Sequence, residues 1–315
     1  IMTIEFVDLK KEMTVKQAME HIKETGVDKE TINTCYVIDN NRILEGVISI
    51  RKLILSEDST VVKDIMDKDV MYINTNDDQE KIASLFKKYD FLSMPVVDNE
   101  RRLVGIVTID DVVDIIDQEN TEDFQKMAAM QPSEEKYLKT NALVLAKNRI
   151  VWLLILMVSA TFSGNIIRKF NDVLQSVVVL ASFIPMLMDT GGNAGSQSST
   201  LIIRGLALGE ISLRDTIKIL WKEIKVGFLV GLALTTVNFV RIYYFEKIDF
   251  LISITVSITL FFTIILAKIV GGILPIIAKK LKIDPAIMAS PLITTIVDAA
   301  ALILYFTTAV WLLGM

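Results

Sequence analysis

The sequence predicts an α+β repeat domain followed by an all-α membrane domain of five transmembrane helices. Three observations support this fold class. Residues 1–149 contain 29 acidic and 20 basic side chains, whereas residues 150–315 contain nine and 13. A segment of the first half recurs 59 residues later. The second half contains five long apolar segments, so a chain that is 52% hydrophobic and 23% charged combines a soluble half with a membrane half.

The repeat defines the first half of the chain. Residues 37–54 align without gaps on residues 96–113. Each copy predicts a strand, an Asp-Asn turn, a second strand and a helix, and a helical pattern precedes each strand pair. The predicted strands are 36–38, 45–49, 95–97 and 104–108, and the predicted preceding helices are 15–25 and 79–88. Ser49 and Thr108 stand where a helix N-cap belongs.

A strand–turn–strand–helix unit repeated at this interval resembles a tandem pair of CBS domains, and the resemblance covers about residues 10–120. It implies a Ser/Thr-x-x-Asp motif that binds adenine nucleotides. The second copy keeps this motif as Thr108 and Asp111, but the first has Lys52 three residues after Ser49. This departure argues against ATP binding. The alternative interpretation of Thr108 is a helix N-cap with no role in binding.

An acidic segment follows the second copy. Residues 110–123 contain seven carboxylates and no basic residue, and Asp78, Glu80 and Asp90 add three more upstream. Like charges at helical spacings repel one another, and carboxylate oxygens suit the hard ions Mg²⁺ and Ca²⁺. The segment therefore predicts a divalent-cation sensor. The alternative is a solvated acidic face.

The composition excludes several function classes. Cys35 is the one cysteine and His21 the one histidine, which removes disulfide frameworks, zinc hydrolases and HExxH proteases. No GxxxxGK[ST] phosphate loop is present, so an ATP-driven pump is not expected. The acidic first half argues against a nucleic-acid partner.

Five segments of the second half are apolar and long enough to cross a bilayer, the second marginally. They are 150–167, 173–188, 226–244, 250–277 and 286–313. The loops at 189–225 and 278–285 carry most of the cations, and cations favour the cytoplasm. We therefore expect a multi-pass protein of the cell membrane, with the N-terminus and the repeat pair in the cytoplasm and the C-terminus outside. The chain also shows no apolar signal segment at its start, which agrees with this orientation.

Asp298 is the most informative residue of the membrane half. If its helix begins at Asp284-Pro285, Asp298 lies about 21 Å along it, past the middle of the hydrocarbon core. A carboxylate there costs about 2.5–3.5 kcal/mol on insertion scales and usually faces water or an ion. The alternative is an internal ion pair with Lys268 of the fourth span.

A polar, glycine-rich segment follows the second span: Pro185-Met-Leu-Met-Asp-Thr-Gly-Gly-Asn-Ala-Gly-Ser-Gln-Ser-Ser-Thr200. At membrane depth, irregular polar backbone is tolerated only where it is buried or lines water. We therefore expect irregular backbone beside the ion path. The alternative is an ordinary cytoplasmic loop.

Together the Gly191–Ser198 run, Asp284-Pro285-Ala286, Ser290-Pro291-Leu292 and Asp298 resemble the MgtE family of Mg²⁺ transporters, as does the order of the parts. The resemblance implies CBS domains over 1–120, a connecting (plug) segment over 121–149 with its helix at about 123–147, and a pore domain over 150–315. It implies a homodimer with a hydrated Mg²⁺ held by Asp298 of both chains. Asp284 would lie at the pore mouth.

The resemblance also implies a set of Mg²⁺-sensing residues: Asp78, Glu80, Asp90, Asp111, Asp114, Glu119, Glu122 and Asp123. The acidic helical domain that usually precedes the CBS pair is not among these 315 residues.

The sequence thus predicts a Mg²⁺-selective channel, not an enzyme, that imports Mg²⁺ and is closed by cytosolic Mg²⁺. Mg²⁺ is both substrate and regulator, and the lipid bilayer is the other partner. Another divalent cation such as Co²⁺ is the alternative substrate. A CBS-regulated anion channel and a membrane enzyme are the other classes. A carboxylate-centred pore argues against the first, and the lack of a nucleophile–base pair in the spans argues against the second.

Overall fold

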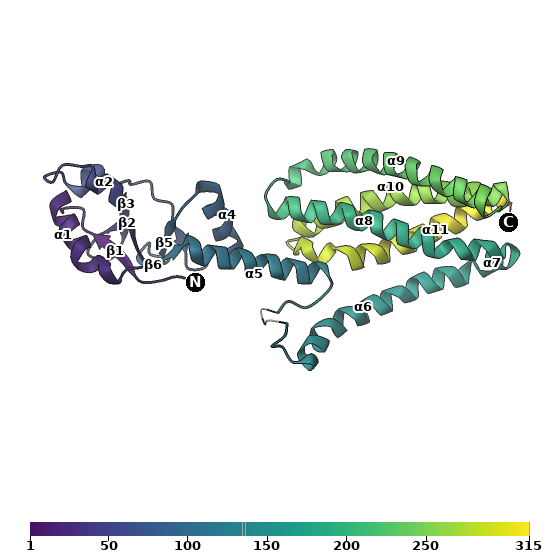
Figure 1. Cartoon of the computed structure of the whole chain (residues 1–315), viewed down its shortest axis with the longest axis horizontal. Coiled ribbons are helices and arrows are strands. Elements are labelled where there is room, and N and C mark those ends of the chain that lie inside the picture. Colours follow the sequence, from purple (N-terminus) through teal and green to yellow (C-terminus); the bar gives the residue numbers. More distant parts are fainter. Residues whose placement is uncertain (134, 136, 315) are drawn as a thin grey trace. The chain divides into compact units, whose positions relative to one another are not determined.

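The structure is a computed structural model that describes residues 1–133, 135 and 137–314. It divides into two compact units, Ile1–Asn120 and Thr121–Met315. Figure 1 labels their elements, and each unit is described by itself.

Unit 1 contains the two sequence repeats, and each repeat builds one three-stranded sheet. In both sheets the first strand runs parallel to the second, which pairs antiparallel with the third. The elements of the first repeat are β1 (Phe6–Leu9), α1 (Val15–Thr25), η1 (Gly26–Asp28), β2 (Thr31–Ile38), β3 (Leu44–Ser49), α2 (Ile50–Ile54) and α3 (Val62–Ile65). Those of the second are β4 (Ile73–Asn74), α4 (Gln79–Tyr89), β5 (Ser93–Val97), β6 (Leu103–Thr108) and α5 (Ile109–Met127), the last of which continues into unit 2.

The predicted strand pairs and their preceding helices are confirmed, and the bounds of α1 are those predicted. The predicted cap at Ser49 is also confirmed, because its hydroxyl accepts a hydrogen bond from the Lys52 N–H at 3.2 Å. Strands β1 and β4 were not predicted. Both are short and pair on one side only, so they carry little pattern of their own.

Apolar side chains pack within each repeat and also between the two. Buried residues of β2 and β3 contact buried residues of β5 and β6 in one cluster that includes Tyr36 and Ile106. At its edge, the Tyr36 hydroxyl lies 3.0 Å from the Ser93 hydroxyl. The two repeats therefore share a core and form one unit.

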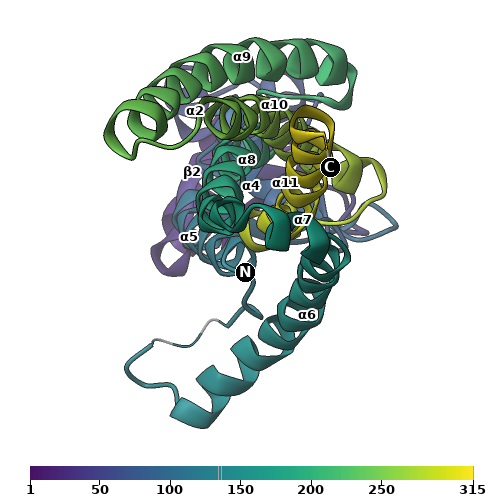
Figure 2. The ribbon, with the colours of Figure 1, turned by 90° about the vertical axis from the view of Figure 1, so that its right-hand side faces the viewer.

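Unit 2 is all helical. Its elements after α5 are α6 (Ala142–Lys169), α7 (Asn171–Ser176), η2 (Val178–Phe183), α8 (Ile184–Ala207), η3 (Leu213–Asp215), α9 (Thr216–Val240), η4 (a π-helical turn, Arg241–Phe245), α10 (Phe250–Lys280), η5 (Pro285–Met288) and α11 (Ser290–Leu313). Helix α10 packs on α8, α9 and α11, and α8 also packs on α11. Figure 2 shows these helices gathered together, with most of α6 standing apart from α8, α9 and α10.

The expected helix over about 123–147 is wrong. Helix α5 ends at Met127, where Ala129 adopts a left-handed backbone conformation and the Met130 N–H bonds to the Gln125 carbonyl at 2.9 Å. Such a 6→1 bond terminates a helix, and Pro132 then prevents its return. Asn141 caps the start of α6 by accepting from the Leu143 N–H at 3.0 Å. Helix α6 therefore runs directly into the first apolar segment.

The second expected span, 173–188, is not one helix. The chain breaks at Val177, whose φ of −137° and ψ of 80° lie outside the helical region. Helix α8 starts afresh at Ile184, with Pro185 in its first turn. Among the described residues, four helices are long and apolar enough to cross a membrane: Ala142–Lys169, Leu213–Phe245, Phe250–Lys280 and Ser290–Leu313. The count of five spans is therefore not confirmed.

The glycine-rich segment is helical, contrary to both interpretations of its sequence. Residues 185–200 lie inside α8. The reason is tertiary packing: the position of a Cβ on Gly271 would fall 2.1 Å from the Gly195 carbonyl oxygen, so the backbones of α8 and α10 meet there. Glycines that weaken an isolated helix allow this close contact between two helices.

Candidate ion pathway and mouth of the bundle

A polar stripe runs along the surface of α8. Its members recur at the helical spacings i, i+4, i+7, i+8 and i+11, and they are exposed or half-buried, whereas Gly191 and Gly195 on the other side are buried. The members are Asp189, Asn193, Ser196, Gln197 and Thr200. A polar face on a helix in an apolar bundle indicates contact with water or ions.

Helix α11 adds a second polar row beside this stripe. Ser290, Thr294 and Asp298 recur every four residues and are half-buried. The Ser290 and Ser196 hydroxyls lie 2.8 Å apart. One turn further, a Cβ on Gly192 would lie 2.8 Å from the Thr294 methyl carbon. The two helices are therefore antiparallel here and form one polar seam.

The same register brings Asp189 beside Asp298. Asp189 lies three residues before Gly192 and Asp298 four residues after Thr294, so both lie one turn further along the seam. The charge of Asp189 acts on Asp298, in agreement with this register. The seam thus carries two carboxylates at one level.

Asp298 lies less deep in its helix than expected. Helix α11 begins at Ser290 because Ala289 is extended, and η5 is a separate short helix. Asp298 is therefore eight residues, or about 12 Å, from the start of the helix. Its carboxylate makes no hydrogen bond or ion pair with any residue that the structure describes. The expected alternative partner, Lys268, donates instead to the Gln197 side-chain oxygen at 3.1 Å.

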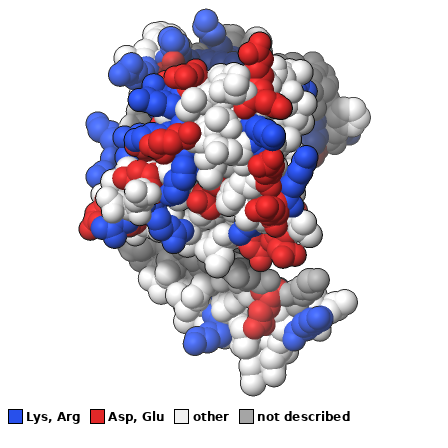
Figure 3. Space-filling model, turned by 90° about the vertical axis from the view of Figure 1, so that its left-hand side faces the viewer, with Lys and Arg blue, Asp and Glu red and all other residues white. Residues whose placement is uncertain are grey.

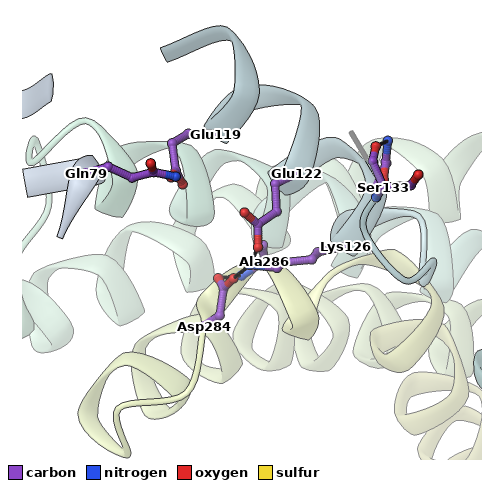
Figure 4. A network of polar contacts seen from close by, with 8 residues as sticks. Gln79, Glu119, Glu122, Lys126, Ser133, Asp284 and Ala286 are labelled. Carbon is purple, nitrogen blue, oxygen red and sulfur yellow. Dashed lines mark hydrogen bonds and ion pairs between the residues drawn. The ribbon is translucent and has the colours of Figure 1, made fainter. Parts of the chain in front are cut away.

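A second group of charges lies at the start of η5. The Asp284 carboxylate caps this helix by accepting from the Ala286 N–H at 2.8 Å. It also accepts from the Lys126 ammonium at 2.6 Å, and Lys126 pairs with Glu122 as well (Figure 4). Burial lowers the pKa of Lys126, but the hydrogen bonds to Asp284 and Glu122 outweigh burial and hold this pKa above its usual range. Lys126 is therefore a fixed cation between two of the predicted Mg²⁺ ligands.

Apolar packing supports this contact. Met127, the last residue of α5, packs against a cluster formed by Ile203, Ala286 and Ala289. The end of α5 is thus attached to both α8 and the α11 side of the bundle. These two helices are the ones that carry the polar seam.

The other predicted sensor residues lie on α4 and α5. Asp78 caps α4 by accepting from the Glu80 N–H at 2.9 Å, and Asp90 ends α4 in a left-handed conformation with φ of 54°. The Gln79 side chain donates to Glu119 at 2.8 Å and so links α4 to α5 (Figure 4).

Asp111, Asp114 and Asp123 lie along α5. Over the residues that the structure describes, no group of three or more His, Cys, Asp or Glu side chains is close enough to hold a metal ion. On the face of unit 1 drawn in Figure 3, acidic and basic side chains are interspersed. The Mg²⁺-sensing role of these carboxylates stays a prediction.

The nucleotide motif is present in one copy. The Thr108 hydroxyl donates to the Asp111 carboxylate at 2.9 Å, and Thr108 is buried. The same hydroxyl holds the pKa of Asp110 below its usual range. In the first copy, Ser49 only caps its helix. The two copies therefore differ in the chemistry that they offer.

Sequence reasoning missed three contributors to these sites. Asp189 had no assigned role, but its i−3 spacing from Gly192 places it on the seam. Lys126 lies just beyond the acidic segment, where its i+4 spacing from Glu122 was a usable signal. Glu223 accepts from the Ser198 hydroxyl at 2.5 Å, and no local pattern indicates that contact between α9 and α8.

Comparison with known proteins finds relatives of both halves of the chain. A family model described as a divalent cation transporter, MgtE, matches residues 184–308, and the CBS domain model matches residues 1–57 and 62–118. The magnesium transporter MgtE of Thermus thermophilus is 39% identical over 309 residues, which cover 98% of this chain and 68% of that protein. The magnesium transporter MgtE of Bacillus subtilis is 38% identical over the same shares.

Two solved structures match part of this chain. The soluble part of a magnesium transporter is 44% identical with a TM-score of 0.37, covering 38% of this chain and 46% of that one. The cytosolic domain of the Mg²⁺ channel MgtE in complex with ATP is 45% identical with a TM-score of 0.36, covering 36% and 46%. The identity and coverage of the full-length relatives show that this chain belongs to the MgtE family of magnesium transporters.

Proposed function

We propose that the chain forms a homodimeric, Mg²⁺-selective channel that imports Mg²⁺ across the cell membrane and is closed by cytosolic Mg²⁺. Residues 1–120 are the sensor, 121–149 the connecting segment and 150–315 the pore domain. The polar seam between α8 and α11 is the observation that carries the proposal. A seam of hydroxyls, amides and carboxylates along membrane helices is costly in lipid unless water or an ion meets it.

The homodimer explains why the seam is open on a single chain. Asp189 and Asn193 are exposed, and Asp298 and Thr294 are half-buried. A second copy related by a two-fold axis presents the same surface and encloses the path. In this arrangement α8 also crosses the membrane, in addition to the four helices that are long and apolar enough to do so.

Mg²⁺ suits such a path because it loses its water reluctantly. A pair of Asp298 carboxylates, one from each chain, attracts the ion, and the seam hydroxyls and the Asn193 amide accept hydrogen bonds from its water shell. Asp298 has no protein partner among the described residues, so its charge is available to the ion. Co²⁺ is the alternative cargo, because its hydrated ion makes the same contacts.

Closure is attributed to the acidic residues of α4 and α5. Seven carboxylates in 14 residues repel one another, and bound Mg²⁺ relieves that repulsion best in a compact arrangement. The end of α5 contacts Asp284 at the start of the α11 side, so a change in α5 reaches the mouth of the seam. The carboxylates concerned are Asp78, Glu80, Asp90, Asp111, Asp114, Glu119, Glu122, Asp123 and Asp284.

ATP is not assigned a role. The Ser/Thr-x-x-Asp motif is complete only in the second copy, and Lys52 takes the place of the acidic residue in the first. The expected orientation keeps the CBS pair in the cytoplasm, where it meets the regulatory Mg²⁺.

Ion uptake into liposomes tests the transport function. Purified full chain is reconstituted, and Mg²⁺, Co²⁺ and Ca²⁺ uptake is measured while the Mg²⁺ concentration on each side is varied separately. We expect Mg²⁺ to enter down its gradient and to inhibit only from the side that carries the CBS pair. Faster Co²⁺ than Mg²⁺ uptake would favour the alternative cargo.

Hydrogen exchange tests the gating. We expect Mg²⁺ to protect residues 110–127 in the wild type, and chelator to reverse the protection. Replacing Asp111, Asp114, Glu119 and Glu122 together by Ala removes the response and leaves the channel open at high cytosolic Mg²⁺. Unchanged protection in the wild type would mean that the segment is only a solvated face.

A further inference from the structure

Two charged side chains are buried inside the helical bundle, and the proposed ion path uses neither. Among the residues that the structure describes, Lys268 of α10 and Glu223 of α9 are the buried charged residues, with exposed fractions of 4% and 9%. A buried charge is expensive unless it is paired. Their positions therefore require an explanation.

Lys268 reaches the polar stripe of α8. Its ammonium donates to the Gln197 side-chain oxygen at 3.1 Å, and Gln197 is an exposed member of that stripe. The positive charge of Lys268 therefore lies next to the stripe along which, in the proposed function, Mg²⁺ passes. Unless it is compensated, this charge raises the free energy of a Mg²⁺ ion in the path.

Glu223 provides the compensating charge. Its carboxylate accepts from the Ser198 hydroxyl at 2.5 Å, and it acts electrostatically on Lys268. Ser198 is the neighbour of Gln197 in sequence, so the cation from α10 and the anion from α9 hold the same turn of α8.

Two glycines make room for the charged side chains. A Cβ on Gly227 would lie 3.5 Å from the Lys268 Cβ, and a Cβ on Gly272 would lie 3.0 Å from the Glu223 Cγ. The α9–α10 interface therefore accommodates both side chains on neighbouring turns, Lys268 opposite Gly227 and Glu223 opposite Gly272.

We propose that Glu223 is a positioning and charge-compensating residue for Mg²⁺ permeation: it neutralises Lys268, whose ammonium holds Gln197 in the lining of the path. The inference rests on the proposed function, because it requires the α8–α11 seam to be the path. This role of Glu223 can be distinguished from a purely structural role by experiment. Removing the anion weakens the binding of a permeating cation, whereas removing the cation does not.

The test measures Mg²⁺ uptake by the full chain in liposomes and compares the Mg²⁺ concentration at half-maximal uptake. For Glu223→Gln we expect this concentration to rise about tenfold, because an unbalanced cation is left beside the path. For Lys268→Met we expect no rise. The double variant is expected to return to within about threefold of the wild type. Glu223→Asp, which keeps the charge, is expected to behave as the wild type.

Matched controls remove the same charges elsewhere. Glu210 and Lys222 are both exposed, so Glu210→Gln and Lys222→Met are expected to leave uptake unchanged. Size-exclusion chromatography checks that each variant is folded. Equal impairment of Glu223→Gln and Glu223→Asp, or no rescue in the double variant, would overturn the inference. Full uptake by Asp298→Asn would instead overturn the proposed path itself, so the two failures are distinguishable.

Discussion

The two units differ in which polar side chains they bury. In unit 1 the buried residues are almost all apolar, and the buried polar side chains among those described are few, such as Ser93 and Thr108. In unit 2 hydroxyls, an amide and two charges are buried between helices whose outer surfaces carry exposed leucine, isoleucine and phenylalanine side chains. The apolar section of α6 is only 6% buried within the chain. The difference indicates two surroundings: water for unit 1, and for unit 2 lipid around a bundle whose largely apolar interior also contains polar side chains.

A polar residue is therefore different evidence for a functional site in each of the two units. A carboxylate on the surface of unit 1 is well solvated and informative only in a cluster. A carboxylate on the α8–α11 seam is informative alone, because few ionisable residues occur at such positions without a role. The predictions below test this distinction, beginning with the largest expected effect.

Replacing Asp298 is expected to have the largest effect. Asp298→Ala removes the carboxylate of the seam, and we expect Mg²⁺ uptake into liposomes to fall to background while the protein stays folded. Asp298→Asn keeps the shape without the charge and is expected to retain at most partial uptake. Asp172→Asn is the matched control, because Asp172 is exposed on α7, and wild-type uptake is expected. Wild-type uptake by folded Asp298→Ala would remove Asp298 from the path.

Lys126→Gln tests the contact at the start of η5. It removes the ion pairs to Asp284 and Glu122, which are partly exposed and contribute about 1 kcal/mol. We expect this contact to favour the closed state, so that its loss raises the cytosolic Mg²⁺ concentration for half-maximal inhibition of uptake about fivefold. Because the pKa of Lys126 is raised, the contact is present at neutral pH and is lost only as the pH rises above the ordinary lysine range.

The control for this prediction is Lys218→Gln. It removes an exposed pair to Asp215 and is expected to leave inhibition unchanged. An identical inhibition curve for Lys126→Gln and the wild type would show that the ion pairs do not contribute to closure.

Asp189→Asn is expected to have a smaller effect on uptake. Asp189 lies at the level of Asp298 on the seam but is less buried, so we expect the water in the path to screen its charge more. We expect the Mg²⁺ concentration for half-maximal uptake to rise about threefold at low ionic strength and less at high salt. A salt-independent effect, or one as large as that of Asp298→Asn, would contradict the assignment of a screened, secondary role.

The smallest effect is expected in unit 1 and concerns stability alone. Burial raises the pKa of Cys35 to about 12 and that of Tyr36 to about 12, so the folded unit holds both protons longer than the unfolded chain. Stability is therefore full below about pH 9 and falls as the pH rises toward 12, by at most about 1.4 kcal/mol per pH unit for each group.

Urea unfolding of residues 1–120 at pH 8 and pH 10.5 measures this effect. The double variant Cys35→Ala with Tyr36→Phe is expected to be less stable at pH 8, because it loses buried contacts, but to lose less stability on going to pH 10.5. An equal loss in both proteins would show that other groups cause the alkaline dependence.

The sequence predicted most strands and helices of unit 1 because the patterns that indicate them are local. A strand, a turn and a helix cap each depend on neighbouring residues, and the repeat at 59 residues showed the same pattern twice. The sequence also made Asp298 a candidate, because a carboxylate inside an apolar span stands out from its surroundings, whereas Asp284 came from the resemblance to the MgtE family; the roles of both stay predictions. The predicted distance of Asp298 from the start of its helix was wrong, because the break at Ala289 depends on backbone geometry that the Asp-Pro start does not reveal.

Only the tertiary structure decided the rest. The glycine-rich segment is helical because its glycines let α10 and α11 approach α8, and a local pattern does not contain those partners. Lys126 meets Asp284 across 158 positions and Lys268 meets Gln197 across 71. Composition and periodicity show which side chains must avoid lipid or water. Which of them meet depends on helix packing, because the free energy of a buried charge is set by neighbours from other helices.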